Sequence, residues 1–293
     1  VYAIKTNIDK LIKEEYIAAY IIGSTASDDY VPGRSDCDIV VVNDSGTSNE
    51  EVFIFNTEIL SAKDTDFKPE QGDVKITVCY RSYNSVLKPI ETILTYDSKQ
   101  MVSGKELGVV EDSILIVGQG IFVAGKDIRE NICLPDTKQF ACYLKVVENL
   151  ASEYIPESDV VELMQISKNI MLYAKHFYYM WTKKIIYSSR IVESIKLIPE
   201  FDFSDILKDG YEITRMSWMR CRIYLNRTPE VLSKYRHMHD VFMQKCVDVC
   251  WNRQIFCTLR GMRGRTIELY HKCYSGERIL YEYNEAQKEI GGI

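Results

Sequence analysis

The chain has 293 residues, and its 36 basic and 42 acidic side chains give a formal net charge of −6. Its 46% content of apolar residues excludes a disordered protein, and its length suits one large domain or two smaller ones. The acidity argues against a protein coated with nucleic acid. However, residues 1–112 carry 11 basic and 20 acidic side chains, and residues 113–293 carry 25 and 22. Because the second part of the chain is slightly basic, the overall acidity is not a strong argument against binding of nucleic acid.

Membrane and secretion signals are absent from the sequence. No apolar run approaches the roughly 18 residues that a membrane-spanning helix needs. The first residues lack the charged and then apolar pattern of a signal peptide. The nine cysteines form no tight framework, which is typical of reduced thiols. We therefore expect a cytoplasmic protein without membrane contact.

The first third of the chain predicts both helices and strands. Apolar residues at helical spacing predict a helix over 4–13. Short apolar, β-branched runs predict buried strands at 18–22 and 38–42, and alternation with a period of two predicts a third strand at 74–80. Residues 49–60 are compatible with either a helix or an extra hairpin.

Beyond residue 134 the apolar spacing becomes helical. The polar segment that begins at Pro135 is typical of a helix start. Further helices are predicted over residues 158–181, 189–197, 213–225, 229–250 and 254–272. These patterns divide the chain into an α/β domain at 1–134 and a helical domain at 135–293.

One segment between the first two predicted strands concentrates residues with chemical potential. Gly23 allows a tight turn after the first strand, and Ser24 begins a short helix whose free N–H groups suit a phosphate. Asp36 and Asp38 stand at the start of the next strand, where alternation places both carboxylates on one face. Such a pair suits a divalent metal ion, because two like charges on a buried strand require a compensating cation.

Gly23-Ser24 followed by Asp36-Cys37-Asp38-Ile39 resembles the signature of the polymerase-beta-like nucleotidyltransferase superfamily. The longer pattern is most similar to its antibiotic-modifying adenylyltransferases, of the aminoglycoside or lincosamide type. Residues 120–128 are similar to a Gly-x-x-Leu-x-Gly-x-Asp element that precedes the helical domain in that family. The resemblance implies an α+β catalytic domain with a short mixed sheet flanked by helices, followed by an all-α helical-bundle domain that binds substrate or nucleotide.

The resemblance also implies a mechanism. Residues 73–78 are similar to the strand that supplies the family's third carboxylate, which would be Asp73 here, although Asp73 follows Gly72 and also suits a turn. Asp36, Asp38 and Asp73 would then hold two Mg²⁺ ions, and Asp73 would act as general base. Gly23 and Ser24 would bind the β- and γ-phosphates of ATP. The implied reaction transfers AMP and releases pyrophosphate.

Two basic residues are further candidates for contact with the phosphates. Arg34, between Gly33 and Ser35, suits either a phosphate contact or a solvated side chain. Lys184 of the helical domain suits either contact with the triphosphate or a solvated helix end.

The acceptor of the nucleotide has three candidate classes. The first is a hydroxyl of a small molecule of antibiotic type, although Arg190 and Ser194 stand where one aminoglycoside-modifying branch carries two acids. The second is RNA or a protein, because residues 211–270 hold 11 basic and 5 acidic side chains. The third is a non-catalytic relative that keeps the fold as a binding or toxin–antitoxin partner. The oligomeric state is not indicated.

Overall fold

The computed structural model describes residues 2–27, 29–31, 35–45, 50–56, 59–63, 73–89, 101–102, 108–136, 158–182, 184–195, 204–216, 218–237 and 274–275. The chain divides into two compact units. The first unit comprises Val1–Thr95 and Lys105–Leu134, and the second comprises Tyr96–Gly104 and Pro135–Ile293.

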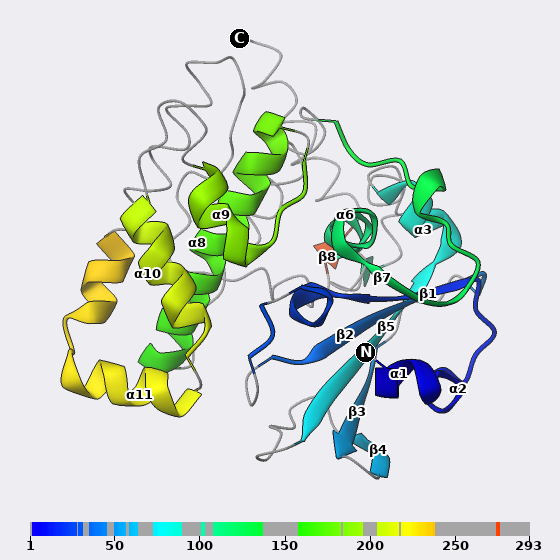
Figure 1. Ribbon diagram of the computed structural model, residues 1–293, viewed down its shortest axis with the longest axis horizontal. Coiled ribbons are helices and arrows are strands. Elements are labelled where there is room, and N and C mark those ends of the chain that lie inside the picture. Colours follow the sequence, from blue (N-terminus) through cyan, green and yellow to red (C-terminus); the bar gives the residue numbers. More distant parts are fainter. Residues whose placement is uncertain are drawn as a thin grey trace. The chain divides into compact units, whose positions relative to one another are not determined.

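A six-stranded mixed sheet forms the centre of the first unit (Figure 1). Its strand order is β4-β3-β5-β2-β1-β7, and every neighbouring pair is antiparallel except β2 and β5, which are parallel. The strands are β1 (Ala18–Ile22), β2 (Cys37–Asn43), β3 (Glu50–Asn56), β4 (Ile59–Lys63), β5 (Val74–Ser82) and β7 (Ile121–Gly125). The predicted mixed sheet with flanking helices is therefore confirmed.

The three predicted strands lie where the sequence indicated them, within β1, β2 and β5. The ambiguous segment at 49–60 forms most of the β3–β4 hairpin. Three consecutive residues of β3, Val52, Phe53 and Ile54, are buried, so both faces of this strand are covered. A strand covered on both faces shows no alternation, which explains why its sequence does not distinguish a strand from a helix.

One face of the sheet packs against two short helices, α1 (Tyr2–Thr6) and α2 (Ile8–Leu11). The predicted single helix at 4–13 is interrupted at Asn7, whose amide donates to the Ile4 carbonyl three residues back. The apolar residues of these helices and the sheet form one buried core: Ile4, Ile8, Leu11, Ile12, Ala19, Ile21, Cys37, Ile39, Val41, Phe53, Ile76, Val78 and Tyr80.

The opposite face of the sheet contacts α3 (Tyr83–Leu87) and α6 (Val109–Gln119). A buried ion pair joins the two layers, since Nε of Arg81 on β5 lies 2.7 Å from Oδ2 of Asp112 on α6. The Ser113 hydroxyl donates to the Val86 carbonyl over 3.1 Å and links α6 to α3. The described part of the sheet is therefore covered on both faces.

The described part of the second unit is mainly helical, as predicted. Its helices are α8 (Asp159–Thr182), α9 (Ser188–Ser194), α10 (Ser204–Thr214) and α11 (Trp218–Arg227), and residues 231–237 are also helical. Helices α9, α10 and α11 contact α8. No helix among these described residues, or those of the first unit, combines the length and apolar character needed to cross a membrane.

Two details of the second unit differ from the sequence prediction. The predicted helix at 213–225 is wrong as a single helix, because the chain leaves the helical path between α10 and α11. There the Met216 amide donates to Ile213 three residues back, and the Arg215 guanidinium bonds to the Tyr211 hydroxyl. A short strand, β8 (Tyr274–Ser275), pairs with β6 (Met101–Val102), although no strand was predicted beyond 134. The predicted helix at 254–272, residues 238–250 of the predicted helix at 229–250, and residues 137–157 lie outside the described part.

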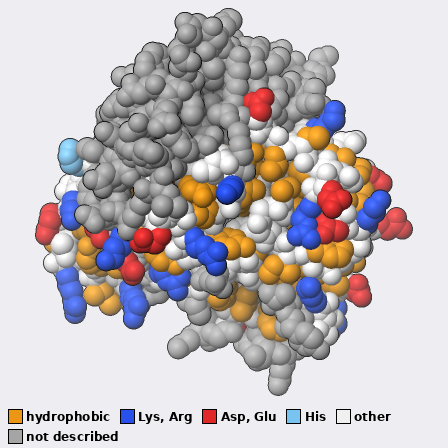
Figure 2. All heavy atoms as spheres, turned by 45° about the horizontal axis from the view of Figure 1, so that its top comes forward, with side chains coloured by type: hydrophobic (Ala, Val, Ile, Leu, Met, Phe, Trp, Pro, Cys, Tyr) orange, Lys and Arg blue, Asp and Glu red, His pale blue; other side chains and the backbone are white. Residues whose placement is uncertain are grey.

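Charges of both signs are mixed on the surface. Figure 2 shows Lys and Arg side chains among Asp and Glu side chains on the face that it draws, with apolar side chains between them. Helix α11 differs from this pattern, since Arg220, Arg222 and Arg227 are exposed and the helix contains no acidic residue.

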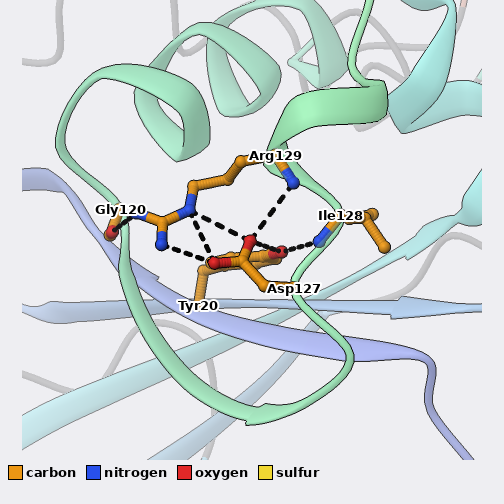
Figure 3. A network of polar contacts seen from close by, with 5 residues as sticks. All are labelled: Tyr20, Gly120, Asp127, Ile128 and Arg129. Atoms are coloured by element: carbon orange, nitrogen blue, oxygen red, sulfur yellow. Dashed lines mark hydrogen bonds and ion pairs between the residues drawn. The ribbon is translucent and has the colours of Figure 1, made fainter.

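A polar network holds the segment after β7 against β1 (Figure 3). The Tyr20 hydroxyl donates to Oδ1 of Asp127 over 3.0 Å and accepts from the Ile128 amide over 2.7 Å. Arg129 closes the network with several bonds from its guanidinium to both carboxylate oxygens of Asp127. Burial raises the pKa of Tyr20 to about 12, so its hydroxyl stays protonated and keeps its role as donor.

This network predicts a pH dependence of stability. The hydrogen bonds from Arg129 lower the pKa of Asp127 from 3.8 to about 2. The stabilisation is therefore complete above about pH 4 and is lost as the pH falls through about 2. Because the side chains of Asp127 and Arg129 are 38% and 39% exposed, we expect the network to contribute less than about 1 kcal/mol.

Urea unfolding measured between pH 5 and pH 2 tests this expectation. The Asp127→Asn variant should be less stable than the wild type at pH 5, and the difference should shrink toward pH 2. Glu130→Gln, an exposed change in the same segment, is the matched control and should show no such trend. A difference that grows on acidification would contradict the assignment.

Candidate functional site

The turn after β1 lies directly against a carboxylate of β2. Ile22, the last residue of β1, is the register partner of Asp38. Gly23 follows with φ of +68°, in the left-handed region that favours glycine. A Cβ atom at Gly23 would lie only 2.8 Å from Oδ2 of Asp38. Glycine is therefore required here for two reasons, the backbone conformation and the close approach of the Asp38 carboxylate.

The segment that follows is a short 3-10 helix, η1 (Gly23–Ala26). The Thr25 hydroxyl donates to the Asp36 carbonyl over 3.3 Å, which ties this helix to the residue just before β2. A four-residue helix has only a small macrodipole, so phosphate binding at Ser24 would depend on individual N–H groups. The structure therefore supports a tight turn at Gly23-Ser24 and weakens the argument from a helix N-terminus.

Asp36 and Asp38 lie two residues apart at the start of β2. The residue between them, Cys37, is fully buried in the core that packs against α1 and α2. Because strand side chains alternate, we expect the carboxylates of Asp36, just before β2, and Asp38 to share the opposite face. Burial raises the pKa of the Cys37 thiol to about 12, so this cysteine is a core residue and stays protonated.

The strand beside this pair supplies an ammonium and a hydroxyl. Strands β2 and β5 are parallel, and Thr77 is the register partner of Asp38. Nζ of Lys75 lies 3.7 Å from Oδ2 of Asp36, with the two side chains 22% and 41% exposed. Thr77 is only 6% exposed, and its buried hydroxyl has no hydrogen-bond partner among the described residues. The face that carries the two carboxylates therefore also carries a cation and an unpaired hydroxyl.

Asp73 is not aligned with the two carboxylates. It precedes β5 and stands four residues before Thr77, about 13 Å along an extended strand. Among the described residues, no group of three His, Cys, Asp or Glu side chains is arranged to hold a metal ion. The role of Asp73 as third ligand and general base stays a prediction.

The two predicted basic contacts remain untested. Arg34 lies outside the described residues. Lys184 belongs to the second unit, where its side chain is exposed and its amide donates to the Thr182 hydroxyl over 3.1 Å at the end of α8.

Lys75 and Thr77 lie beside the candidate site but were not predicted from the sequence as site residues. Alternation over 74–80 already places them on one face of a strand. Only the parallel pairing with β2 shows that this face belongs to Asp36 and Asp38.

No protein-family model matches the chain, and no curated protein shows significant similarity to it. The resemblance to nucleotidyltransferases therefore rests on the sequence motifs of this chain alone. The structural feature relevant to it is the arrangement of Gly23, Asp36 and Asp38.

Proposed function

We propose that this chain is an Mg²⁺-dependent nucleotidyltransferase, which transfers AMP from ATP to a hydroxyl of a small molecule and releases pyrophosphate. The observation that carries the proposal is the close approach of the turn at Gly23 to the carboxylate of Asp38, a proposed metal ligand. Gly23 adopts a positive φ and leaves no room for a Cβ beside Asp38. Because the backbone of this turn lies so close to the carboxylate, the two are suited to bind a phosphate together with its cation.

The residues of the site fit one divalent cation. Asp36 and Asp38 offer carboxylate oxygens on one face, and the Thr77 hydroxyl beside them has no partner among the described residues. Mg²⁺ prefers oxygen ligands and binds nucleotide phosphates through one or two carboxylates. When bound, it would neutralise phosphate charge and make the α-phosphorus more reactive.

The chain's own residues would position the nucleotide. Asp36 and Asp38 would orient the cation, and the N–H groups at Gly23 and Ser24 would donate to phosphate oxygens. The acceptor hydroxyl would then attack in line with the leaving pyrophosphate. Positioning and electrostatics account for most of the catalysis in phosphoryl-type transfer.

A specific observation also supports a second candidate, a relative that binds nucleotide but transfers it slowly or not at all. The ion pair of Lys75 with Asp36 puts a positive charge beside the carboxylates, where a third acid would be expected. Transfer of AMP is the first proposal because both paired carboxylates and the glycine turn are present. Transfer to RNA is a weaker alternative, supported by the exposed arginines of α11.

Incubation with ATP labelled at the α-phosphate tests these candidates. The acceptors would be aminoglycosides, lincosamides, bulk tRNA and protein, each with and without Mg²⁺, and the products are labelled acceptor and pyrophosphate. A labelled drug with pyrophosphate supports the proposal, and labelled RNA or protein supports the alternative. Nucleotide binding without product supports the second candidate, whereas no nucleotide binding contradicts all three.

A further inference from the structure

The charge beside the two carboxylates comes from Lys75. Its ammonium lies 3.7 Å from Oδ2 of Asp36, and its side chain is mostly shielded from water. The ion pair is therefore part of the same face as Asp38, Thr77 and the Gly23 turn.

Among the described residues of β5, no carboxylate stands beside the pair to hold a second metal ion. Two-metal sites place their ions about 3.5–4 Å apart, with ligands from at least one further acidic residue. The two positions of β5 that flank the carboxylate pair are Lys75 and Thr77, and neither carries a negative charge. A second cation beside Asp36 would also lie close to the Lys75 ammonium, and like charges at such distances repel.

The buried hydroxyl of Thr77 independently points to a ligand. Its oxygen is inaccessible to water and has no partner among the described residues, although its strand neighbour is Asp38. A buried hydroxyl without a partner destabilises a protein unless a ligand or water pairs with it. The register places Thr77 beside Asp38, so the proposed cation site is the nearest candidate partner for this hydroxyl.

We infer that the site takes a single divalent cation, and that the Lys75 ammonium replaces the second one by contacting a phosphate oxygen of the nucleotide. This inference rests on the proposed function and replaces the two Mg²⁺ ions that the sequence resemblance implies. In the free protein, Lys75 pairs with Asp36. In the complex with nucleotide, the cation would bind the two carboxylates, and the Lys75 ammonium would contact a phosphate oxygen instead of Asp36.

The Lys75→Met variant separates this role from a purely structural one. Its expected effects have opposite signs for two probes. Affinity for the Mn²⁺ complex of α,β-methylene-ATP should fall by about tenfold, because a charge-assisted bond to phosphate is lost. Affinity for Mn²⁺ alone should rise, because no ammonium competes for Asp36. A fall in both affinities, or no change in either, would overturn the inference.

The Lys75→Glu variant tests the number of cations directly. Equilibrium dialysis against Mn²⁺ and α,β-methylene-ATP counts the ions and nucleotides that each chain binds. We expect one Mn²⁺ per bound nucleotide in the wild type and two in Lys75→Glu. Lys10→Glu, the same charge change on the exposed side of α2, is the matched control and should bind one.

The outcomes distinguish the inference from the proposed function. Two Mn²⁺ ions per nucleotide in the wild type, or one in a folded Lys75→Glu variant, overturn the inference alone. No binding of nucleotide to the wild type overturns both. Circular dichroism establishes folding, and if Lys75→Glu does not fold, the opposite shifts in Lys75→Met decide the matter.

Discussion

Replacement of Asp38 by Asn is expected to lower Mg²⁺-dependent AMP transfer by about a thousandfold or more, because a metal ion supplies several kcal/mol of charge stabilisation. Asn keeps the shape of the side chain but removes its charge, and its amide nitrogen is a poor ligand for Mg²⁺. The fold should survive, since the side chain of Asp38 lies at the end of β2 and is only partly buried. The rate is measured with α-labelled ATP, and folding by circular dichroism.

Asp44→Asn is the matched control for this experiment. Asp44 follows the other end of β2 and is exposed, so its replacement removes the same charge away from the candidate site. It should leave transfer unchanged. A fully active Asp38→Asn variant would refute the assignment of Asp38 as a metal ligand, whatever the acceptor proves to be.

Gly23→Ala is expected to have the second largest effect. The methyl group would lie 2.8 Å from Oδ2 of Asp38, and φ at this position is +68°. An L-residue in this conformation costs about 1–2 kcal/mol, and the carboxylate must also move. We therefore expect a free energy of unfolding lowered by about 1–3 kcal/mol. We also expect the affinity for the Mn²⁺ complex of α,β-methylene-ATP to fall by at least about tenfold, since 1.4 kcal/mol corresponds to that factor.

Gly210→Ala is the control for the glycine substitution. Gly210 lies within α10, where the added methyl group would make only ordinary contacts with Ile170 and Met171. Alanine favours a helix over glycine by up to about 1 kcal/mol, so this variant should be slightly more stable. Urea unfolding and nucleotide titration measure both variants. A Gly23→Ala variant with unchanged nucleotide affinity would contradict the role of this turn in binding phosphate, and unchanged stability would contradict its close contact with Asp38.

The strands around the site were predictable because they are short, apolar and bounded by turn residues. The predicted runs at 18–22, 38–42 and 74–80 lie within β1, β2 and β5. In α6, by contrast, residues 114–117 are all apolar, so the sequence shows no helical period there and a helix was not predicted. The edge strand β7 was also not predicted, since its residues are only half-buried and are held in place by pairing with β1.

The helices were predictable where one apolar stripe faces one neighbour. The prediction at 158–181 differs from α8 (Asp159–Thr182) by one residue at each end. The prediction at 213–225 joined two helices, because the apolar period continues across the interruption at Arg215 and Met216. Periodicity reports which side chains are buried, and it does not report where the backbone changes its hydrogen-bonding pattern.

The composition of the candidate site could be predicted from the sequence: a glycine and a serine after one strand, and two carboxylates on one face of the next. These follow from local rules, namely a tight turn and a period of two. The residues of β5 that lie beside these carboxylates could not be predicted, because they depend on how the strands pair. The parallel register aligns Asp38 with Thr77, and Lys75 forms an ion pair with Asp36. The register is set by the packing of whole strands against the core. A shift of two residues keeps the same side chains on each face, so the alternation within either strand does not reveal the register. For this reason the ion pair between Lys75 and Asp36 could not be predicted from the sequence.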